Sequence, residues 1–300
     1  MFKINLPPWQ KSPPLPNCQL GVGWYNNGIR LVKLSHTNDA TPTLDLYKSL
    51  PYKYPITLHK FVKRLSLEQV PCVGVIDISN YQLLLTEAPP VLDSELLAAV
   101  RWQIQELVDF NIEDAIIDVF DEPTPATQLP KKMIYVVAAP KEVVQTDSDK
   151  LLSAGFKLTA LDIPELALRN IAALLPEDKY GVALLWLTPK HGMLTITRRA
   201  TLYLSRTVEA EGNLKQLLPL MIKEIRRSFT YYENHFNQAP INYLVIAPMS
   251  PPLPNLCQYL STHLKINVRL LDLNKLLHSE RHLNVVEQAQ YFPMLGAALR

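Results

Sequence analysis

The sequence predicts an α/β protein of two lobes that repeat one order of strands and helices. The chain has 300 residues, about twice the length of a typical domain, so two domains or one bilobal unit is expected. Hydrophobic residues make up 48% and charged residues 19%, which are ordinary values for a globular protein. A strand-rich segment opens each half, and helical patterns follow it. Together these observations favour a duplicated α/β architecture.

The first half begins with strands and continues with strands and helices in alternation. Leu20–Leu34 has apolar residues on both sides of an Asn-Asn-Gly turn, which predicts a hairpin. Residues 72–78 and 81–87 are also rich in β-formers, and we expect a second hairpin there. Asp93 is expected to cap a helix that runs to Val108 with one apolar stripe. The remaining predicted elements are strands at 43–49, 115–121, 133–139 and 156–161 and helices at 57–67, 141–154 and 164–175.

The second half repeats this order. Three β-rich runs between residues 181 and 208 predict a meander. A long helix is predicted at 213–236, because apolar residues recur there at helical spacing. The remaining predicted elements are a strand at 241–247, a helix at 255–264, a strand at 266–271 and a short final helix that ends at Arg300.

The repeated order matches the plan of the actin-like fold, which is a duplicated RNase H-like fold with two lobes. A nucleotide in that fold lies between the lobes, held by the turns of two equivalent hairpins. We assign residues 1–18 to a proline-rich tail and residues 19–165 to the first lobe, with an inserted α+β subdomain at about 70–140. Residues 166–300 are assigned to the second lobe.

Charge, cysteine content and hydropathy limit the classes of function. Thirty basic residues against 28 acidic ones give a net charge of +2, which lacks the excess of positive charge that nucleic-acid-binding proteins carry. The three cysteines are far apart and odd in number, which excludes a disulfide framework and indicates a reducing compartment. The longest uncharged stretch, 234–264, is interrupted by prolines and cannot span a membrane. We therefore expect a soluble, cytoplasmic protein, and any membrane association would come through a partner.

The familiar motifs of enzymes and metal sites do not occur in the sequence. It has 9 glycines and 25 prolines, where average usage would give roughly 21 and 15. No glycines form the GxGxxG or GxxxxGK[ST] patterns of phosphate-binding loops. His278 and His282 are four residues apart but lack the HExxH pattern of zinc proteases, and no GxSxG motif occurs. We expect no catalytic residue, metal or cofactor.

Three stretches of the chain carry distinctive sequences. Residues 95–121 are ELLAAVRWQIQELVDFNIEDAIIDVFD, residues 224–233 are EIRRSFTYYE, and residues 292–300 are FPMLGAALR. They resemble, in order, the inserted subdomain, the second-lobe helix and the closing helix of PilM-type pilus assembly proteins. The resemblance covers nearly the whole chain from Leu20, and the cytoplasmic domain of the secretion protein GspL is a more distant relative.

The same resemblance implies that the nucleotide-contacting residues of the family are lost here. The family's first hairpin resembles GxDxGSxSxK, but Gly23 stands at the Asp position and Tyr25 at the turn glycine. Arg30 matches the family's basic residue and could still meet an anion. Trp186 and Pro248 replace an Asp and a Gly-Gly turn of the second lobe. The degenerate positions are Gly23, Tyr25, Asn26, Asn27, Arg30, Trp186 and Pro248.

The function that the resemblance implies is that of a non-catalytic cytoplasmic scaffold of a type IV pilus machine, of the mannose-sensitive haemagglutinin (MSHA) type. Its expected partners are the N-terminal cytoplasmic tail of a PilN-like inner-membrane protein and the cytoplasmic pilus motor ATPase. A homodimer is a further possibility. The alternative function is an ATP-binding actin-like switch, as in PilM.

Two features suggest where partners bind. Trp102 lies opposite the apolar stripe of its predicted helix, which indicates either an interface or a site that another subdomain covers. In the family, the partner tail lies in a groove between the first lobe and the inserted subdomain and begins with a segment like Ile-Asn-Leu-Leu-Pro. Ile4, Asn5 and Leu6 resemble that segment. Our hypothesis is that this tail occupies the groove of its own or a neighbouring copy, and the alternative is a tether with a chance similarity.

Overall fold

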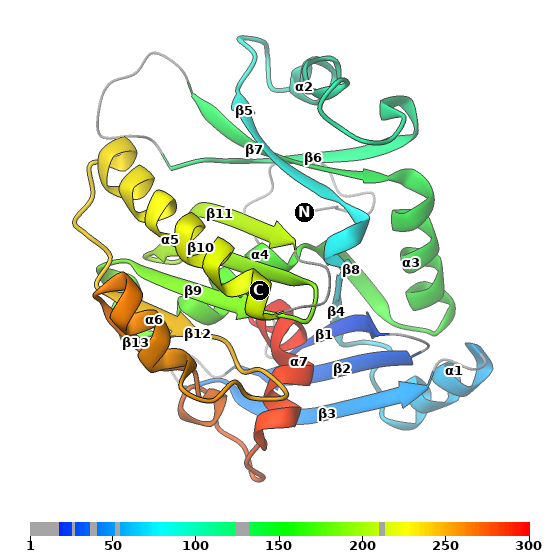
Figure 1. Ribbon diagram of the computed structural model, residues 1–300. Coiled ribbons are helices and arrows are strands. Elements are labelled where there is room, and N and C mark those ends of the chain that lie inside the picture. The colour runs from blue at the N-terminus through cyan, green and yellow to red at the C-terminus, as the bar shows by residue number, and fades with distance from the viewer. Residues whose placement is uncertain (1–17, 26–27, 37–40, 52–54, 124–131, 210–213) are drawn as a thin grey trace.

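The computed structural model describes residues 18–25, 28–36, 41–51, 55–123, 132–209 and 214–300. They form two five-stranded sheets and one three-stranded sheet (Figure 1). The first sheet has the order β3-β2-β1-β4-β8 and the second the order β11-β10-β9-β12-β13. The strands of the first sheet are β1 (Cys18–Tyr25), β2 (Gly28–Ser35), β3 (Thr43–Pro51), β4 (Pro71–Val75) and β8 (Lys157–Asp162). Those of the second are β9 (Val182–Leu187), β10 (His191–Arg198), β11 (Thr201–Glu209), β12 (Tyr243–Ile246) and β13 (Asn267–Leu270).

The two five-stranded sheets share one topology. Their central strands, β1 and β9, each pair antiparallel with a hairpin partner, β2 or β10, and parallel with β4 or β12. The fifth strands, β8 and β13, are also parallel to their neighbours. β9 has the sequence VALLWL and is almost wholly buried, as expected for a strand between two helical layers. The repeated topology confirms the predicted duplicated α/β fold.

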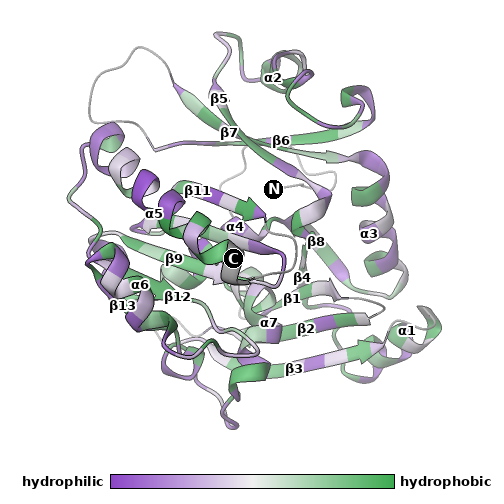
Figure 2. Cartoon of the chain, in the orientation of Figure 1, coloured by the Kyte–Doolittle hydropathy of each residue, from purple (hydrophilic) through white to green (hydrophobic). Residues whose placement is uncertain are grey.

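Helices cover both faces of the two sheets. α1 (Pro55–Arg64) and α3 (Lys141–Ser153) pack on the outer face of the first sheet, and α5 (Leu214–Phe236) and α6 (Leu256–Leu264) on that of the second. Hydrophobic residues concentrate in the strands and hydrophilic ones on these outer helices (Figure 2). Among the described helices, none combines the length and the hydropathy that crossing a membrane requires.

Two further helices, α4 (Pro164–Ala172) and α7 (Val285–Ala298), lie between the sheets and join the lobes. α4 follows the first sheet along the chain but packs on β9, β10 and β11 of the second. α7 follows the second sheet but packs on β1, β2 and β4 of the first. Residues 285–298, which we assigned to the second lobe, therefore cover the first sheet. This exchange buries the apolar inner faces of both sheets against the two helices.

Glycine makes this arrangement possible at two points. A Cβ atom at Gly296 of α7 would lie 2.2 Å from the carbonyl oxygen of Ala167 in α4. A Cβ atom at Gly21 of β1 would lie 1.9 Å from the carbonyl oxygen of Met294. Both distances are far shorter than a carbon and an oxygen that are not bonded to each other can approach. Only glycine therefore allows α7 to lie this close to β1 and α4.

The inserted subdomain is a sheet with one helix. β5 (Gln82–Glu87), β7 (Met133–Pro140) and β6 (Ala115–Asp121) form an antiparallel sheet in that order. α2 (Leu96–Ile104) covers one face through buried residues that include Val100 and Ile104. The opposite face packs on the core of the first lobe through Val137 and Ala139.

Local predictions for this segment were partly wrong. β4 and β5 do not form a hairpin, because β4 lies between β1 and β8 and uses both of its edges there. A 3-10 turn at Ile78–Asn80 then leads the chain into the other sheet. The insert consequently begins after Val75 rather than at about residue 70. Asp93 does not cap α2, which begins at Leu96 with Glu95 as its N-cap residue.

The inserted subdomain also contacts the second lobe. The hydroxyl of Tyr135 in β7 donates a hydrogen bond of 2.9 Å to the carbonyl oxygen of Tyr203 in β11. Glu122, which follows β6, has a buried carboxylate with Oε2 3.5 Å from Nε2 of His235 in α5. Because the insert touches both lobes, it restricts their relative movement in addition to the α4–α7 contact.

The helix contact gives a first prediction. Gly296→Ala should lower the free energy of unfolding by about 2 kcal/mol or more, because overpacking against a backbone carbonyl outweighs the gain of about 1 kcal/mol in helix propensity. The control is Gly192→Ala, whose Cβ would lie 2.6 Å from Sδ of Met221, a side-chain atom that can shift by a rotamer change as a backbone carbonyl cannot. Urea unfolding should show a clearly larger loss for Gly296→Ala, and equal losses would contradict the steric argument.

Candidate functional site

The first hairpin of the chain is packed against α7 rather than open to a ligand. Gly23 of β1, which resembles the position of a nucleotide-site Asp, faces the side chain of Met294. A Cβ atom at Gly23 would lie 2.8 Å from Sδ of Met294. Met294 itself is buried. A carboxylate at position 23 could therefore be accommodated only if this methionine moved.

Arg30, the positively charged residue of this hairpin, makes its contacts within the protein. The Arg30 guanidinium lies 4.0 Å from the ring centre of Tyr25, a distance typical of a cation–π contact. Its Nη1 donates a hydrogen bond of 3.3 Å to the carbonyl oxygen of Gln290 in α7. Burial lowers the pKa of Arg30, and the nearby hydroxyls of Tyr25 and Tyr291 oppose that shift. Arg30 thus links β2 to α7. The turn residues 26 and 27 lie outside the described residues.

The equivalent hairpin of the second lobe, between β9 and β10, closes on itself. Trp186 is partly buried and packs against the core that contains Met294. The Thr188 hydroxyl oxygen accepts a hydrogen bond of 2.9 Å from the backbone N–H of His191, and the Thr188 N–H donates one of 2.8 Å to the His191 carbonyl oxygen. The backbone N–H of His191 is therefore already satisfied within the turn.

The loop after β12 is also buried within the protein at its first two residues. Ala247 is completely buried, and its N–H donates a hydrogen bond of 2.8 Å to the Leu185 carbonyl oxygen. Pro248 is buried and has no N–H to offer a ligand. This loop therefore presents no free backbone donor at the two positions where the family has a Gly-Gly turn.

One continuous hydrophobic core runs through the interlobe region. It extends from Val32 and Leu34 of β2 in the first lobe to Leu184 of β9 and Met193 of β10 in the second. Apolar side chains of α4 and α7 fill the space between them. The space between the two sheets around α4 and α7 is thus occupied by the protein's own side chains.

Taken together, these positions do not fit a magnesium nucleotide. A metal-bound phosphate needs a carboxylate and backbone N–H groups that approach it closely. At the described positions the molecule offers a methionine, an internally bonded arginine and a tryptophan instead. Of the predicted degenerate residues, Gly23 and Trp186 border the interlobe core, Arg30 contacts Tyr25 and α7, and Asn26 and Asn27 lie outside the described residues.

A buried polar cluster that the sequence did not predict lies where β8 meets α4. Asp162 is 1% exposed, and its Oδ1 accepts a hydrogen bond of 3.0 Å from the N–H of Ile163. Burial lowers the pKa values of Arg169 and Arg300, and the charge of Asp162 opposes both shifts. The protein's own guanidinium groups therefore balance this carboxylate. The sequence does contain a hint of this cluster, because Asp162, Ile163 and Pro164 stand between a predicted strand and a predicted helix.

Glu165, the second residue of α4, also belongs to this cluster. It is 2% exposed, and the Tyr81 hydroxyl donates a hydrogen bond of 2.5 Å to its Oε2. Burial raises the pKa of Glu165 to about 7, although the hydrogen bond from Tyr81 acts in the opposite direction. Tyr81 opens the inserted subdomain, so this contact ties the insert to the helix that joins the lobes.

A groove lies between the inserted subdomain and α3. It has a volume of about 630 Å³ and is bounded by the end of β7, the turn before β6 and the exposed side of α3. Its lining residues are Asp114, Pro140, Lys141, Glu142, Gln145, Thr146 and Asp149. The lining is mostly polar, with both hydrogen-bond donors and acceptors, as an extended peptide backbone requires.

The predicted partner-contact residues lie elsewhere. Trp102 is 69% exposed, so no other part of the described chain covers it, and it does not line the groove. It lies on α2, which covers the face of the insert sheet opposite the first lobe. Ile4, Asn5 and Leu6 lie outside the described residues.

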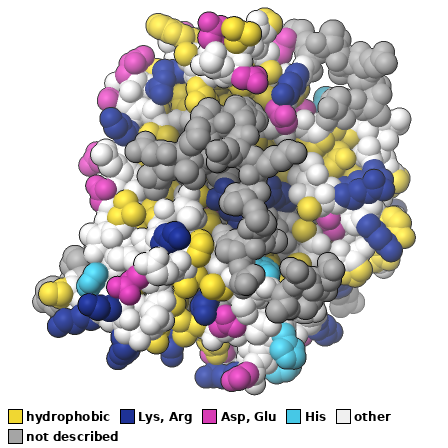
Figure 3. All heavy atoms as spheres, turned by 180° about the vertical axis from the view of Figure 1, so that it is seen from behind, with side chains coloured by type: hydrophobic (Ala, Val, Ile, Leu, Met, Phe, Trp, Pro, Cys, Tyr) yellow, Lys and Arg dark blue, Asp and Glu magenta, His cyan; other side chains and the backbone are white. Residues whose placement is uncertain are grey.

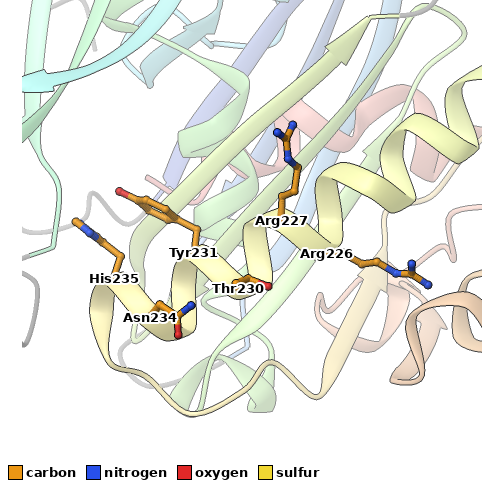
Figure 4. A pocket seen from close by; sticks show the side chains of 6 residues that line it. All are labelled: Arg226, Arg227, Thr230, Tyr231, Asn234 and His235. Carbon is orange, nitrogen blue, oxygen red and sulfur yellow. The ribbon is translucent and has the colours of Figure 1, made fainter.

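A hollow of about 650 Å³ follows the C-terminal half of α5. Figure 4 shows Tyr231 and His235 pointing to one side of the helix and Arg226 to the other. The ring of Tyr231 stacks on that of His235 at 4.6 Å, and burial raises the pKa of the neighbouring Glu122, although His235 opposes the rise. All the lining residues of this hollow come from α5, and two of them, Tyr231 and His235, already contact each other.

Comparisons with known proteins identify the fold. A chain of the PilM–PilN type IV pilus biogenesis complex superposes with a TM-score of 0.70 at 20% identity, covering 95% of this chain and 97% of that one. The cytoplasmic domain of EpsL, an inner-membrane component of the type II secretion system of Vibrio cholerae, gives 0.52 at 14% identity, with 91% and 93% covered. A Bacteroides thetaiotaomicron protein with an actin-like ATPase fold gives 0.51 at 10% identity, with 91% and 95% covered. The chain therefore has the actin-like fold, as predicted. No protein-family model and no curated protein sequence matches it.

Glu165 gives a prediction about pH. Its pKa is about 7 in the folded protein against 4.5 for the ordinary group, so the native state holds the proton more tightly than the unfolded state. The stabilisation is complete below about pH 4.5 and is lost as the pH rises through about 7, by about 3 kcal/mol in total. Glu165→Gln stays neutral and accepts the same hydrogen bond from Tyr81.

Urea unfolding of both proteins between pH 5 and pH 8.5 measures this difference. The free energy of unfolding of the original protein should fall relative to that of Glu165→Gln as the pH rises. Parallel curves for the two proteins would show that Glu165 ionises in the folded state without cost.

Proposed function

We propose that this protein is a non-catalytic scaffold of a type IV pilus assembly machine and acts by binding alone. The single observation that carries the proposal is the filled interlobe region. Met294 lies over Gly23, and Arg30 is bonded to Tyr25 and Gln290. Trp186 adds its side chain to the same core. These residues supply none of the carboxylate and N–H groups on which nucleotide chemistry in this fold depends.

The proposed site of action is the groove between the inserted subdomain and α3. One of the similar structures is a PilM–PilN pilus biogenesis complex, which supports a PilN-like inner-membrane protein as the partner. The groove offers Gln145 and Thr146 on an exposed helix face, beside the carboxylates of Glu142 and Asp149. Such side chains can hydrogen bond to the backbone of an extended peptide, here the N-terminal cytoplasmic tail of that protein.

The wider assignment follows from the sequence resemblance. Within the PilM family, the short chain and the VxRWxIxELxDF pattern around Trp102 resemble most the MshI component of the MSHA pilus. We therefore propose an MSHA-type apparatus, a cytoplasmic location at the inner membrane through partners, and a second contact with the pilus motor ATPase. A homodimer is a further proposal, which sedimentation of the purified protein tests.

Millimolar Mg-ATP should leave the melting temperature unchanged and release no heat in calorimetry. A site with a Kd of about 0.1 mM would stabilise the folded protein by about 1.4 kcal/mol at about 1 mM ligand, which is easily measured. An ATP-binding actin-like protein serves as the positive control. A sub-millimolar site in this protein would refute the scaffold proposal and favour the ATP-dependent switch.

The groove gives a separate prediction. A synthetic Ile-Asn-Leu-Leu-Pro peptide should bind the full chain, and Thr146→Arg should weaken binding about tenfold or more by filling the groove, a loss of about 1.4 kcal/mol. Ser153→Arg is the matched control, because Ser153 is exposed on the same helix but outside the groove. Equal affinity of the two variants would remove the groove from the proposal.

The same titration examines the tail of the chain itself. We propose that residues 4–6 compete with the partner peptide for the groove. Deleting residues 2–9 should then raise the affinity for the peptide in the original protein but not in Thr146→Arg. Unchanged affinity and unchanged oligomeric state after the deletion would leave the tail as a simple tether.

A further inference from the structure

The outer surface of the inserted subdomain exposes large apolar side chains. Trp102 on α2 is 69% exposed, and Leu97 on the same helix is 44% exposed. Leu92 precedes the helix and Leu107 follows it, and these are 71% and 56% exposed. A tryptophan this exposed, with three exposed leucines in the same short segment, is unusual on a surface that contacts only water, and large exposed apolar side chains of this kind mark interaction sites. We call these four residues the α2 patch.

The same segment carries a strong negative charge. Residues 87–122 contain ten acidic residues and one basic residue, a net charge of −9 within a chain whose net charge is +2. Glu95 is the N-cap residue of α2, and Glu106 follows the helix by two residues. Both are exposed, and they lie seven residues before and four residues after Trp102, spacings that place side chains on one side of a helical segment. Figure 3 shows hydrophobic and acidic side chains next to one another along the top edge, over the inserted subdomain.

The carboxylates beside Trp102 are not neutralised by ion pairs. The one cation of the segment, Arg101, donates hydrogen bonds to the carbonyl oxygens of Ile112 and Ala115 instead. At the far end of the segment, Asp121 and Glu122 have ion pairs with Lys132 and His235. No described ion pair involves Glu95 or Glu106.

We propose that the α2 patch and its carboxylates form a docking surface for a cationic polypeptide segment that also carries apolar side chains. Charge complementarity selects this occupant. Nucleic acid and anionic lipid would be repelled by the net charge of −9 in residues 87–122. Lysine and arginine side chains of a partner would meet Glu95 and Glu106, while its apolar side chains would cover Trp102. This surface is separate from the groove, because α2 and the first lobe cover opposite faces of the same sheet.

The experiment is a selection of short helical peptides from a random displayed library against the immobilised full chain. Recovered peptides should be enriched in lysine and arginine together with leucine, isoleucine or phenylalanine. Trp102→Ala should weaken their binding about 30-fold, and the double substitution Glu95→Lys with Glu106→Lys about tenfold or more. Tyr180→Ala is the matched control, because Tyr180 is 68% exposed on the second lobe, and it should bind the peptides as the original protein does.

Three results would overturn the proposal. The first is that the peptides whose binding depends on Trp102 are neutral or acidic, and the second is recovery of no peptide whose binding depends on Trp102. The third is concentration-dependent dimerisation in sedimentation experiments that Trp102→Ala abolishes, which would assign the patch to a second copy of this chain. Because each outcome is judged by its dependence on Trp102, which does not line the groove, failure here is distinguishable from failure of the scaffold proposal.

Discussion

The close contact of α7 with α4 and β1 is the constraint on which the rest of the molecule depends. Gly296 and Gly21 remove the side chains that would hold α7 away from Ala167 and from β1. The sheets of the two lobes are thereby joined by two tightly packed helices with one hydrophobic core around them. Side chains of both sheets and of the two helices share that core, and such protein interiors are packed at about the density of organic crystals.

This constraint explains how the few glycines are used. Gly21 and Gly23 lie on the face of β1 that meets Met294, so they serve helix packing rather than a phosphate-binding turn. The contacts of Tyr135 with the second lobe and of Glu122 with His235 then connect the inserted subdomain to it. These contacts join the inserted subdomain to the second lobe, which agrees with the proposed scaffold that presents fixed surfaces.

The fold was largely predictable from sequence, whereas the site was predictable only in part. Hydrophobic periodicity located nearly every strand and helix, because most of them bury one continuous face. It could not show that β4 pairs with β1 and β8 instead of β5, since strand partners depend on contacts distant in sequence. The placement of Asp162 near two arginines, and the hydrogen bond from Tyr81 to Glu165, could not be predicted for the same reason. Helical spacing alone could not show whether another subdomain covers Trp102, and its exposure shows that no other described part of the chain does.

The inserted subdomain is well suited to hold two partners at once. Its sheet is covered on one face by α2 and on the other by the first lobe, and the groove begins where that second face meets α3. A peptide in the groove and a cationic segment on the α2 patch would contact different residues, so neither would have to leave for the other to bind. The buried hydrogen bond from Tyr81 to Glu165 fixes the base of this subdomain to α4. Binding on either face would therefore act on the same subdomain, and linkage of two partners would need no change in the distance between the lobes.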